Sequence, residues 1–260
     1  MNNSRNSLSL KTSSEIETIS KGGILLSQIL KKLFLFVRPG LSTRQIDQKA
    51  TVLIRQTGGF PSFKKVPGYK HSTCLTVNDE VVHSLPTDYL LREGDILGID
   101  IGLYYKGFHA DTSITLPIAK VSPSTQRFLE AGKDSLIQAI KAAKPGNTVW
   151  DISKAMETPI KDSGFAPVQS LTGHGIGRSL HEPPAVPCFT QGDKSHSPVL
   201  LPGLVLALET IYNQGSPEVI YKNSDNWTIA TRDGKLSAVF EATIVVTPSG
   251  PRILTPLIWL

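Results

Sequence analysis

The chain has 260 residues, of which 40% are hydrophobic and 19% are charged, and its formal net charge is +5 at pH 7. This composition is typical of a folded globular protein and excludes collagenous, low-complexity and wholly disordered chains. The two cysteines are too few for a disulfide framework, so we expect a reducing compartment, the cytoplasm. The basic residues are scattered along the chain, and their short cluster over residues 64–70 is interpreted as a solvated loop.

The N-terminal residues 1–14 are rich in Asn and Ser and lack the apolar run of a secretory signal. We expect them to form a flexible segment that precedes one compact domain over residues 15–260. Ser14 and Glu17 have the spacing of a capping box, which predicts a helix that begins there. The apolar part of this helix, residues 24–37, contains two lysines and is shorter than a membrane span. We therefore predict a buried amphipathic helix and no membrane partner.

The same order of elements occurs twice along the chain. Pro39-Gly40 and Pro145-Gly146 lie 106 residues apart, and each pair separates two predicted helices, which indicates an internal duplication. The expected elements are helices from about Ser14 to before Pro39 and over residues 42–57, 126–143 and 149–161, and strands over residues 72–82, 96–103, 108–116, 199–212, 227–230 and 238–246. We predict an α+β domain of two related halves that share one sheet, with a site where the halves meet.

Four acidic residues stand inside apolar strand patterns: Asp100, Asp111, Glu209 and Glu241. An ionised carboxylate in such a setting is costly unless it is paired or binds a cation. A two-residue turn at residues 105–106 would place Asp100 directly opposite Asp111, and a divalent cation would remove their repulsion. The alternatives are that Asp100 and Asp111 both face solvent or one of them is protonated, and that Glu209 and Glu241 are edge-strand charges or ion-pair partners. These alternatives explain one such acid more readily than four.

Three histidines are candidates for the same site. His174 lies in the glycine-rich segment 173–177, where we expect a loop, and it is the natural nitrogen ligand. His83 and His181 are candidates for acid/base or polarising roles. Taken singly, each could equally be an exposed or a packing histidine, so their assignment depends on the acids around them.

The five candidate ligands occur in the order and local contexts of the type I methionine aminopeptidases, which the chain resembles from about residue 15 to the end. The resemblance also covers the segments 99–102, 110–112 and 173–177 and the sequence His181-Glu182-Pro183-Pro184. It implies the pita-bread fold, with helices packed on a curved antiparallel sheet in two pseudo-symmetric halves. It further implies a centre of two divalent ions (Co, Mn, Fe or Zn) bound by Asp100, Asp111, His174, Glu209 and Glu241.

The same resemblance implies removal of the initiator methionine from proteins by a hydroxide that bridges the two ions. Glu209 would then accept a proton, His181 would stabilise the oxyanion and His83 would assist the leaving amine. The residues implied for substrate binding are His83, His181 and a methionine pocket made by Phe63, Val66, Tyr69, Cys74 and Trp227. Phe63 and Val66 stand where many family members have cysteine and tyrosine, and Ala242 stands where histidine often follows the last ligand.

The partners that the resemblance implies are the N-terminal methionine of nascent polypeptides and the ribosome near its peptide exit. We expect a monomer without a membrane or sequence-specific nucleic acid partner. Two alternatives stay open. One is a proline-specific (Xaa-Pro) peptidase of the same fold. The other is a non-catalytic pita-bread protein that binds RNA or protein, although such proteins usually lose metal ligands and all five are present here.

Overall fold

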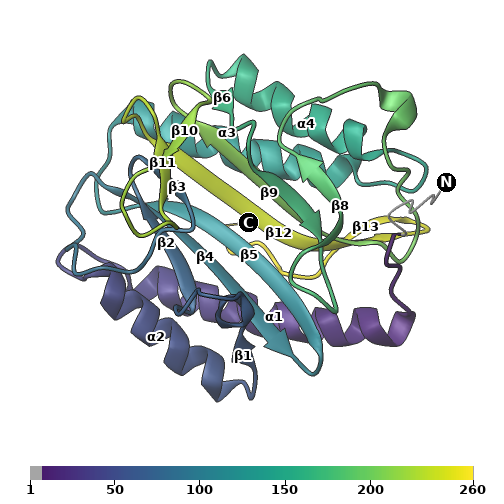
Figure 1. Ribbon diagram of the computed structural model, residues 1–260, viewed down its shortest axis with the longest axis horizontal. Helices are drawn as coiled ribbons and strands as arrows, with labels where there is room; N and C mark the ends of the chain where they lie inside the picture. Colours follow the sequence, from purple (N-terminus) through teal and green to yellow (C-terminus); the bar gives the residue numbers. More distant parts are fainter. Residues whose placement is uncertain (1–7, 260) are drawn as a thin grey trace.

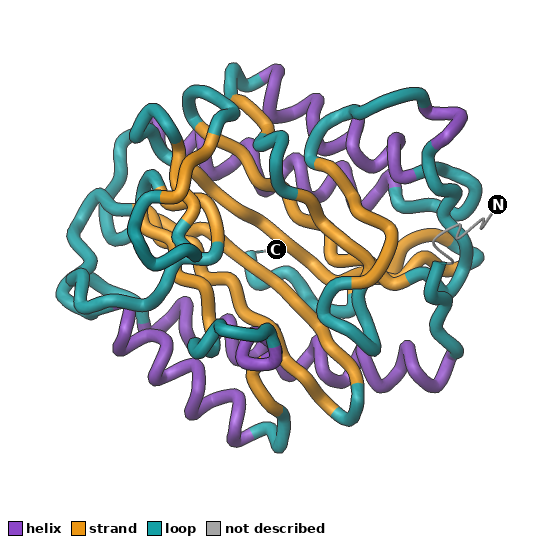
Figure 2. The backbone as a smooth tube through the Cα atoms, in the orientation of Figure 1, coloured by secondary structure: helices purple, strands orange, loops and turns teal. Residues whose placement is uncertain are grey.

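The computed structural model describes residues 8–259, and these form one large antiparallel sheet flanked by two pairs of helices (Figure 1). The first pair is α1 (Ser13–Phe36) and α2 (Thr43–Gln56), and the second is α3 (Pro123–Ala142) and α4 (Val149–Asp162). Seven strands of the ten-stranded sheet form its main path, in the order β1, β4, β5, β12, β9, β7 and β8. The two helix pairs lie along opposite halves of this sheet (Figure 2).

The first half of the chain contributes five strands and one short 3-10 helix, and the second half contributes the remaining eight strands and a second 3-10 helix. Their bounds are β1 (Phe60–Pro61), η1 (Ser62–Lys65), β2 (Thr73–Val77), β3 (Glu80–Val82), β4 (Ile96–Tyr105), β5 (Phe108–Pro117), β6 (Ala166–Pro167), β7 (Thr172–Gly175), β8 (Glu182–Pro187), η2 (Lys194–His196), β9 (Val205–Asn213), β10 (Val219–Tyr221), β11 (Ile229–Thr231), β12 (Ser237–Thr247) and β13 (Gly250–Ile253). β10, β11 and β3 form a separate three-stranded sheet.

The duplication is visible in the way each half begins. Ser42 and Thr148 are the N-caps of α2 and α4, and each also makes an isolated bridge to a later segment of its own half, at Leu90 and Val199. The two N-caps lie 106 residues apart in the sequence, which is the offset of the two Pro-Gly pairs. The predicted α+β class, the predicted bounds of α2 and α4 and the two related halves are therefore confirmed.

The helix α1 begins earlier than predicted. Its N-cap is Thr12, which forms a capping box with Glu15 instead of the predicted pair Ser14 and Glu17. The preceding residues are in contact with the domain, because Leu10 makes a bridge to Leu204 and the Lys11 amide donates to the carbonyl of Gly203. The expected flexible segment therefore differs from the structure over residues 8–14, and its first seven residues lie outside the described part.

One face of α1 is buried and the other is exposed. Ile19, Leu26 and Leu33 pack in the core, whereas Leu35 is 74% exposed. The expectation of a buried amphipathic helix therefore holds for one face only. Among the described residues, no helix is both long enough and apolar enough to cross a membrane.

The two faces of the central sheet have different partners. A Cβ at Gly132 of α3 would lie within 2.6 Å of the rings of Phe240 and Tyr212, so these side chains face the helices. Because side chains alternate along a strand, Glu241 points to the opposite face. Ala242 points to the helix side, as Phe240 does, and it is fully buried there. The site therefore has to be built on the face away from the helices.

Candidate active site

The turn between β4 and β5 sets the positions of the first two acidic residues. It consists of Lys106 and Gly107, both with positive φ, as a two-residue hairpin turn requires. Asp100 therefore pairs with Ser113, and Asp111 pairs with Gly102. The prediction that Asp100 and Asp111 lie directly opposite each other is wrong. The predicted turn was one residue too early, and the resulting shift of two positions leaves both carboxylates on the same face.

The five candidate ligands occupy two neighbouring rows that run across the sheet. In the first row, Asp100 pairs with Ser113, Ser113 with Glu241 and Glu241 with Glu209. The second row lies two residues away along the strands. Asp111 precedes Ser113 by two residues on β5, and His174 on β7 pairs with Ala207, which precedes Glu209 by two residues on β9. Directly paired residues of a sheet share a face, so all five side chains project to the same side. Residues from both halves of the duplication thus meet at the centre of the sheet.

His174 lies in β7, a short strand, and not in the predicted loop. The glycines on both sides explain the difference: a Cβ at Gly173 would be 2.5 Å from the carbonyl of Ala207, and one at Gly175 would be 2.3 Å from that of Pro183. Glycine is therefore required for the neighbouring backbones to approach, which the strand pattern alone does not reveal.

The imidazole of His174 is oriented for ligation. Its Nδ1 donates to the carbonyl of Gly175 at 2.8 Å, which leaves Nε2 without the proton and 3.4 Å from Oε1 of Glu209. Burial, with a further contribution from His181, lowers the pKa of His174 to about 4. The ring is therefore neutral at pH 7, the form in which histidine binds a metal.

The acidic residues have pKa values shifted in the opposite direction. Burial raises the pKa of Asp100 to about 7. Burial, and then the neighbouring carboxylates, raise the pKa values of Asp111, Glu209 and Glu241 well above their usual range. Such a cluster cannot hold several negative charges without a compensating cation.

Three of the five candidate ligands lie close enough together to bind one metal ion. Asp111, His174 and Glu241 each offer a ligand atom, and these atoms lie within 4.8 Å of one another. Within the described residues, one carboxylate oxygen of Asp100 and one of Glu241 are buried without a hydrogen-bond partner. Buried carboxylate oxygens without donors are what a bound cation would complete, so the residues present fit a divalent metal site.

A cavity of about 140 Å³ adjoins the carboxylates, and all twelve predicted site residues line it. An apolar cavity of similar volume in another protein holds a benzene ring, so there is room for one side chain of modest size. Two further residues, Val82 and Leu180, also line the cavity. They were missed in the sequence because they have no chemical signature, although each directly precedes a predicted histidine.

The apolar wall of the cavity is built mainly from aromatic rings. The rings of Tyr69 and Trp227 lie 5.0 Å apart and those of Phe63 and Tyr69 lie 6.3 Å apart, in each case edge to face. Val66 and the buried thiol of Cys74 lie beside them. This arrangement favours an apolar, flexible side chain, and a thioether gains additional contacts with ring edges.

His83 and His181 approach the cavity from separate segments. His83 follows β3 with a φ of 60°, an uncommon backbone conformation for this residue type. Its ring lies 6.5 Å from that of Trp227, and the ring of His181 lies 4.5 Å from that of His174. Burial lowers the pKa values of both histidines, and His181 lowers that of His83 further. Both are therefore neutral at pH 7. A neutral imidazole can donate a hydrogen bond from one nitrogen and accept a proton at the other.

The fold and the site together define a metal-dependent peptidase. The sequence matches metallopeptidase family M24 over residues 17–248, a range that contains all the candidate ligands. Membership of a metallopeptidase family implies divalent metal ions, in agreement with the fit described above.

Comparison with individual proteins identifies the group of metallopeptidases to which the chain is most similar among those compared. The chain is 38% identical to methionine aminopeptidase 1 of Bacillus subtilis, over 94% of this chain and 98% of that protein. It is 39% identical to a methionine aminopeptidase of Clostridium perfringens, over 95% of this chain and 98% of that protein. The crystal structure of the Thermotoga maritima methionine aminopeptidase superposes with a TM-score of 0.92, at 32% identity, and covers 96% of this chain and 100% of that chain. The chain therefore belongs to the methionine aminopeptidases of metallopeptidase family M24, and the predicted pita-bread fold is confirmed.

The proline-specific alternative has weaker support. The prolidase from Pyrococcus furiosus superposes with a TM-score of 0.77 at 22% identity, and the match covers 95% of this chain and 65% of that chain. At this identity the likeness shows the fold alone.

Proposed function

We propose that this chain hydrolyses the bond after an N-terminal methionine, with two divalent ions held by Asp100, Asp111, His174, Glu209 and Glu241. The observation that carries the proposal is the pair of ligand rows at the centre of the sheet, directly beside a cavity with aromatic walls. Four ionised carboxylates carry four negative charges, which two divalent cations would balance. Mn, Fe, Co and Zn all accept this set of oxygen and nitrogen donors.

The chemistry divides between the ions and the protein side chains. When bound, divalent ions lower the pKa of coordinated water and so supply hydroxide at neutral pH. Glu209 belongs to the first ligand row, also lines the cavity, and would accept a proton there. His181 and His83, which both line the cavity, would donate hydrogen bonds to the substrate carbonyl and to the leaving amine.

The pocket would select the methionine side chain. Phe63, Tyr69 and Trp227 present ring edges and faces to the cavity, and Val66 and Cys74 complete its apolar wall. The methionine thioether is flexible and polarisable, so it can fill an irregular aromatic pocket better than a branched side chain.

The physiological substrates would be nascent polypeptides that still begin with methionine, and we propose that the chain acts on them in the cytoplasm as a monomer near the ribosomal exit. Cys74 and Cys188 are both buried free thiols, in keeping with a reducing compartment.

A peptide panel separates this proposal from its two alternatives. We expect purified protein loaded with Mn²⁺ to release methionine from Met-Ala-Ser and to leave Xaa-Pro dipeptides intact, with Asp100→Asn as the inactive control preparation. Hydrolysis of the Xaa-Pro dipeptides alone would instead establish the proline-specific alternative. A folded, metal-loaded chain that cleaves neither substrate but binds RNA with a steep salt dependence would support the non-catalytic alternative.

A further inference from the structure

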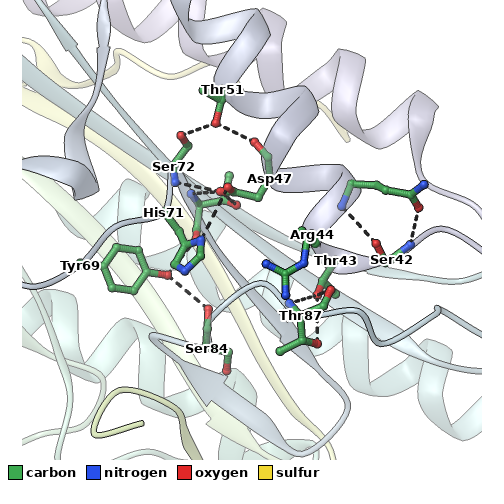
Figure 3. A network of polar contacts seen from close by, with 12 residues as sticks. Ser42, Thr43, Arg44, Asp47, Thr51, Tyr69, His71, Ser72, Ser84 and Thr87 are labelled. Atoms are coloured by element: carbon green, nitrogen blue, oxygen red, sulfur yellow. Dashed lines mark hydrogen bonds and ion pairs between the residues drawn. The ribbon is translucent and has the colours of Figure 1, made fainter.

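The carboxylate of Asp47, which is not one of the candidate metal ligands, binds the backbone segment that leads into the wall of the pocket. Asp47 lies on α2, its side chain is 11% exposed, and it does not line the cavity. Its Oδ1 accepts hydrogen bonds from the amide of Ser72 at 2.8 Å, the amide of Thr73 at 3.0 Å and the hydroxyl of Thr73 at 2.8 Å. Figure 3 shows the bond from Ser72 to Asp47. Three hydrogen bonds to one carboxylate oxygen fix the backbone at this point.

The same backbone segment continues directly into the pocket. The carbonyl of Thr73 accepts a hydrogen bond from the hydroxyl of Tyr69 at 2.8 Å, and this hydroxyl is also 3.2 Å from the carbonyl of Ser84 (Figure 3). Cys74, the next pocket residue, follows Thr73 in the chain. Asp47 is thus linked to Tyr69 and Cys74 through Thr73, which it binds directly, and it forms a hydrogen bond with neither of them.

Further contacts from α2 hold the other end of this segment. The hydroxyl of Thr43 accepts from the amide of Thr87 at 2.8 Å, and the amide of Arg44 donates to the carbonyl of Thr87 at 2.8 Å. The hydroxyls of Thr51 and Ser72 lie 2.6 Å apart. The helix α2 therefore holds both ends of residues 72–87, and these residues contain Cys74 and His83.

The second half of the duplication provides an internal comparison. The position that corresponds to Asp47 at the offset of 106 residues is Ser153 on α4, which follows Ile152 as Asp47 follows Ile46. Ser153 is buried, so burial at this helix position does not require a carboxylate. The buried carboxylate of α4 lies one turn further on, at Glu157, and accepts from the amide and hydroxyl of Thr190. Each half therefore uses a helix carboxylate to hold a neighbouring segment, but the segment that Asp47 holds is the one that leads into the pocket.

We propose that Asp47 is a positioning residue for the methionine pocket, an inference that rests on the proposed function. By fixing Thr73 it holds Tyr69 and Cys74 in the arrangement that accepts an unbranched side chain. We expect a larger effect on the affinity for methionine than on the rate of the hydrolytic step, because Asp47 binds Thr73 directly, whereas His83 lies ten residues further along and the metal ligands lie on other strands.

Two substitutions at Asp47 test this role. Asp47→Ala removes the acceptor and leaves three buried donors unpaired, and we expect it to raise KM for Met-Gly-Met on the order of tenfold. Inhibition by free L-methionine should weaken by a similar factor, with kcat within about threefold of the wild type. Asp47→Asn keeps an oxygen that can accept from the same donors, so it should restore most of the affinity. Metal content should equal that of the wild type in both variants.

Two further variants control the comparison. Asp88→Asn breaks the exposed ion pair with Arg44 at the start of the same helix and should change neither KM nor kcat. Thr73→Val removes one of the three donors without leaving Asp47 unpaired, so it should raise KM in the same direction by less. This variant decides the question if Asp47→Ala does not fold.

The inference is overturned if Asp47→Ala lowers kcat while KM and inhibition by L-methionine stay unchanged, or if it matches the wild type in all three. Calorimetric binding of L-methionine keeps the test independent of turnover. If the wild type releases no methionine, the proposed function fails, and the effect of Asp47→Ala on L-methionine binding still decides the role of Asp47.

Discussion

Replacing Glu241 by Gln is expected to abolish methionine release and, in the metal-free protein, to raise the free energy of unfolding. The two amino acids are nearly isosteric, so the fold is retained. Activity should fall by at least about 100-fold because a candidate ligand that lies close to Asp111 and His174 loses its charge. Stability should rise because burial and the carboxylates of Asp111, Glu209 and Asp100 all oppose the ionised form of Glu241. The gain should be larger at pH 8 than at pH 6, because more of the wild-type carboxyl group is ionised at the higher pH.

The change in stability of the metal-free protein with pH shows whether ionisation of the buried acids stabilises or destabilises the fold. The folded-state pKa values of the four acids are raised, so between about pH 4 and the folded pKa values the folded state binds more protons than the unfolded state. The free energy of unfolding of the metal-free protein therefore falls as pH rises, including through the pKa of Asp100 at about 7. It should fall less in Glu241→Gln than in the wild type, because one of the four acids is absent. Urea unfolding of chelated protein at pH 6 and pH 8 measures this, with Glu130→Gln, an exposed acid on α3, as the control. Retained activity, or a less stable metal-free variant, would exclude Glu241 as a ligand.

Replacing Lys11 by Met is expected to lower the free energy of unfolding by about 3–5 kcal/mol, because it leaves a buried carboxylate unpaired. The side chain of Lys11 is fully buried, that of Glu182 is 8% exposed, and the two form an ion pair. Lys11 also donates to the carbonyl of Ser9 at 2.7 Å. The pair joins the segment before α1 to the residue that directly follows His181, so a loss of activity should accompany the loss of stability.

Two comparisons isolate the buried charge. Arg252→Met breaks the exposed pair with Glu17 and should cost at most about 1 kcal/mol. Combining Lys11→Met with Glu182→Gln should recover part of the loss. Burial raises the pKa of Glu182, but the hydrogen bonds and charge of Lys11 and the amide of Ser179 lower it overall, so its contribution is present above the unfolded pKa and is lost as pH falls. The difference between wild type and Lys11→Met should therefore shrink below about pH 4. Equal losses for Lys11→Met and Arg252→Met would contradict the assignment.

The fold could be predicted from the sequence where local chemistry decides the structure. The helices α2 and α4 have polar N-caps and begin after Pro-Gly pairs, so their bounds followed from caps and breakers. The expected strand over residues 72–82 is divided into β2 and β3 by a turn at Asn78, which has a positive φ. The short strands β7 and β8 were missed because their sequences, rich in Gly and Pro, lack the alternation of strands. Tertiary pairing with β9, and not intrinsic preference, makes β7 a strand.

The site was predictable in composition but not in register. Acidic residues within apolar strands identified Asp100, Asp111, Glu209 and Glu241, since burial of a carboxylate requires compensation. Their arrangement in two rows depends on the turn at Lys106 and Gly107, which differs by one residue from the predicted turn. Asp47 has no signal of its own in the sequence. Its role depends on hydrogen bonds to residues 25 and 26 positions away, and no local signal records such contacts.

The most direct test of the account is methionine release from Met-Ala-Ser by chelator-treated protein that is then titrated with Mn²⁺. Our account predicts no release from the metal-free protein and recovery of activity as the metal is added, with none recovered for Asp100→Ala at the same metal concentrations. Release of methionine at an unchanged rate by the metal-free protein, or by Asp100→Ala, would contradict the assignment of the two carboxylate rows as a metal centre.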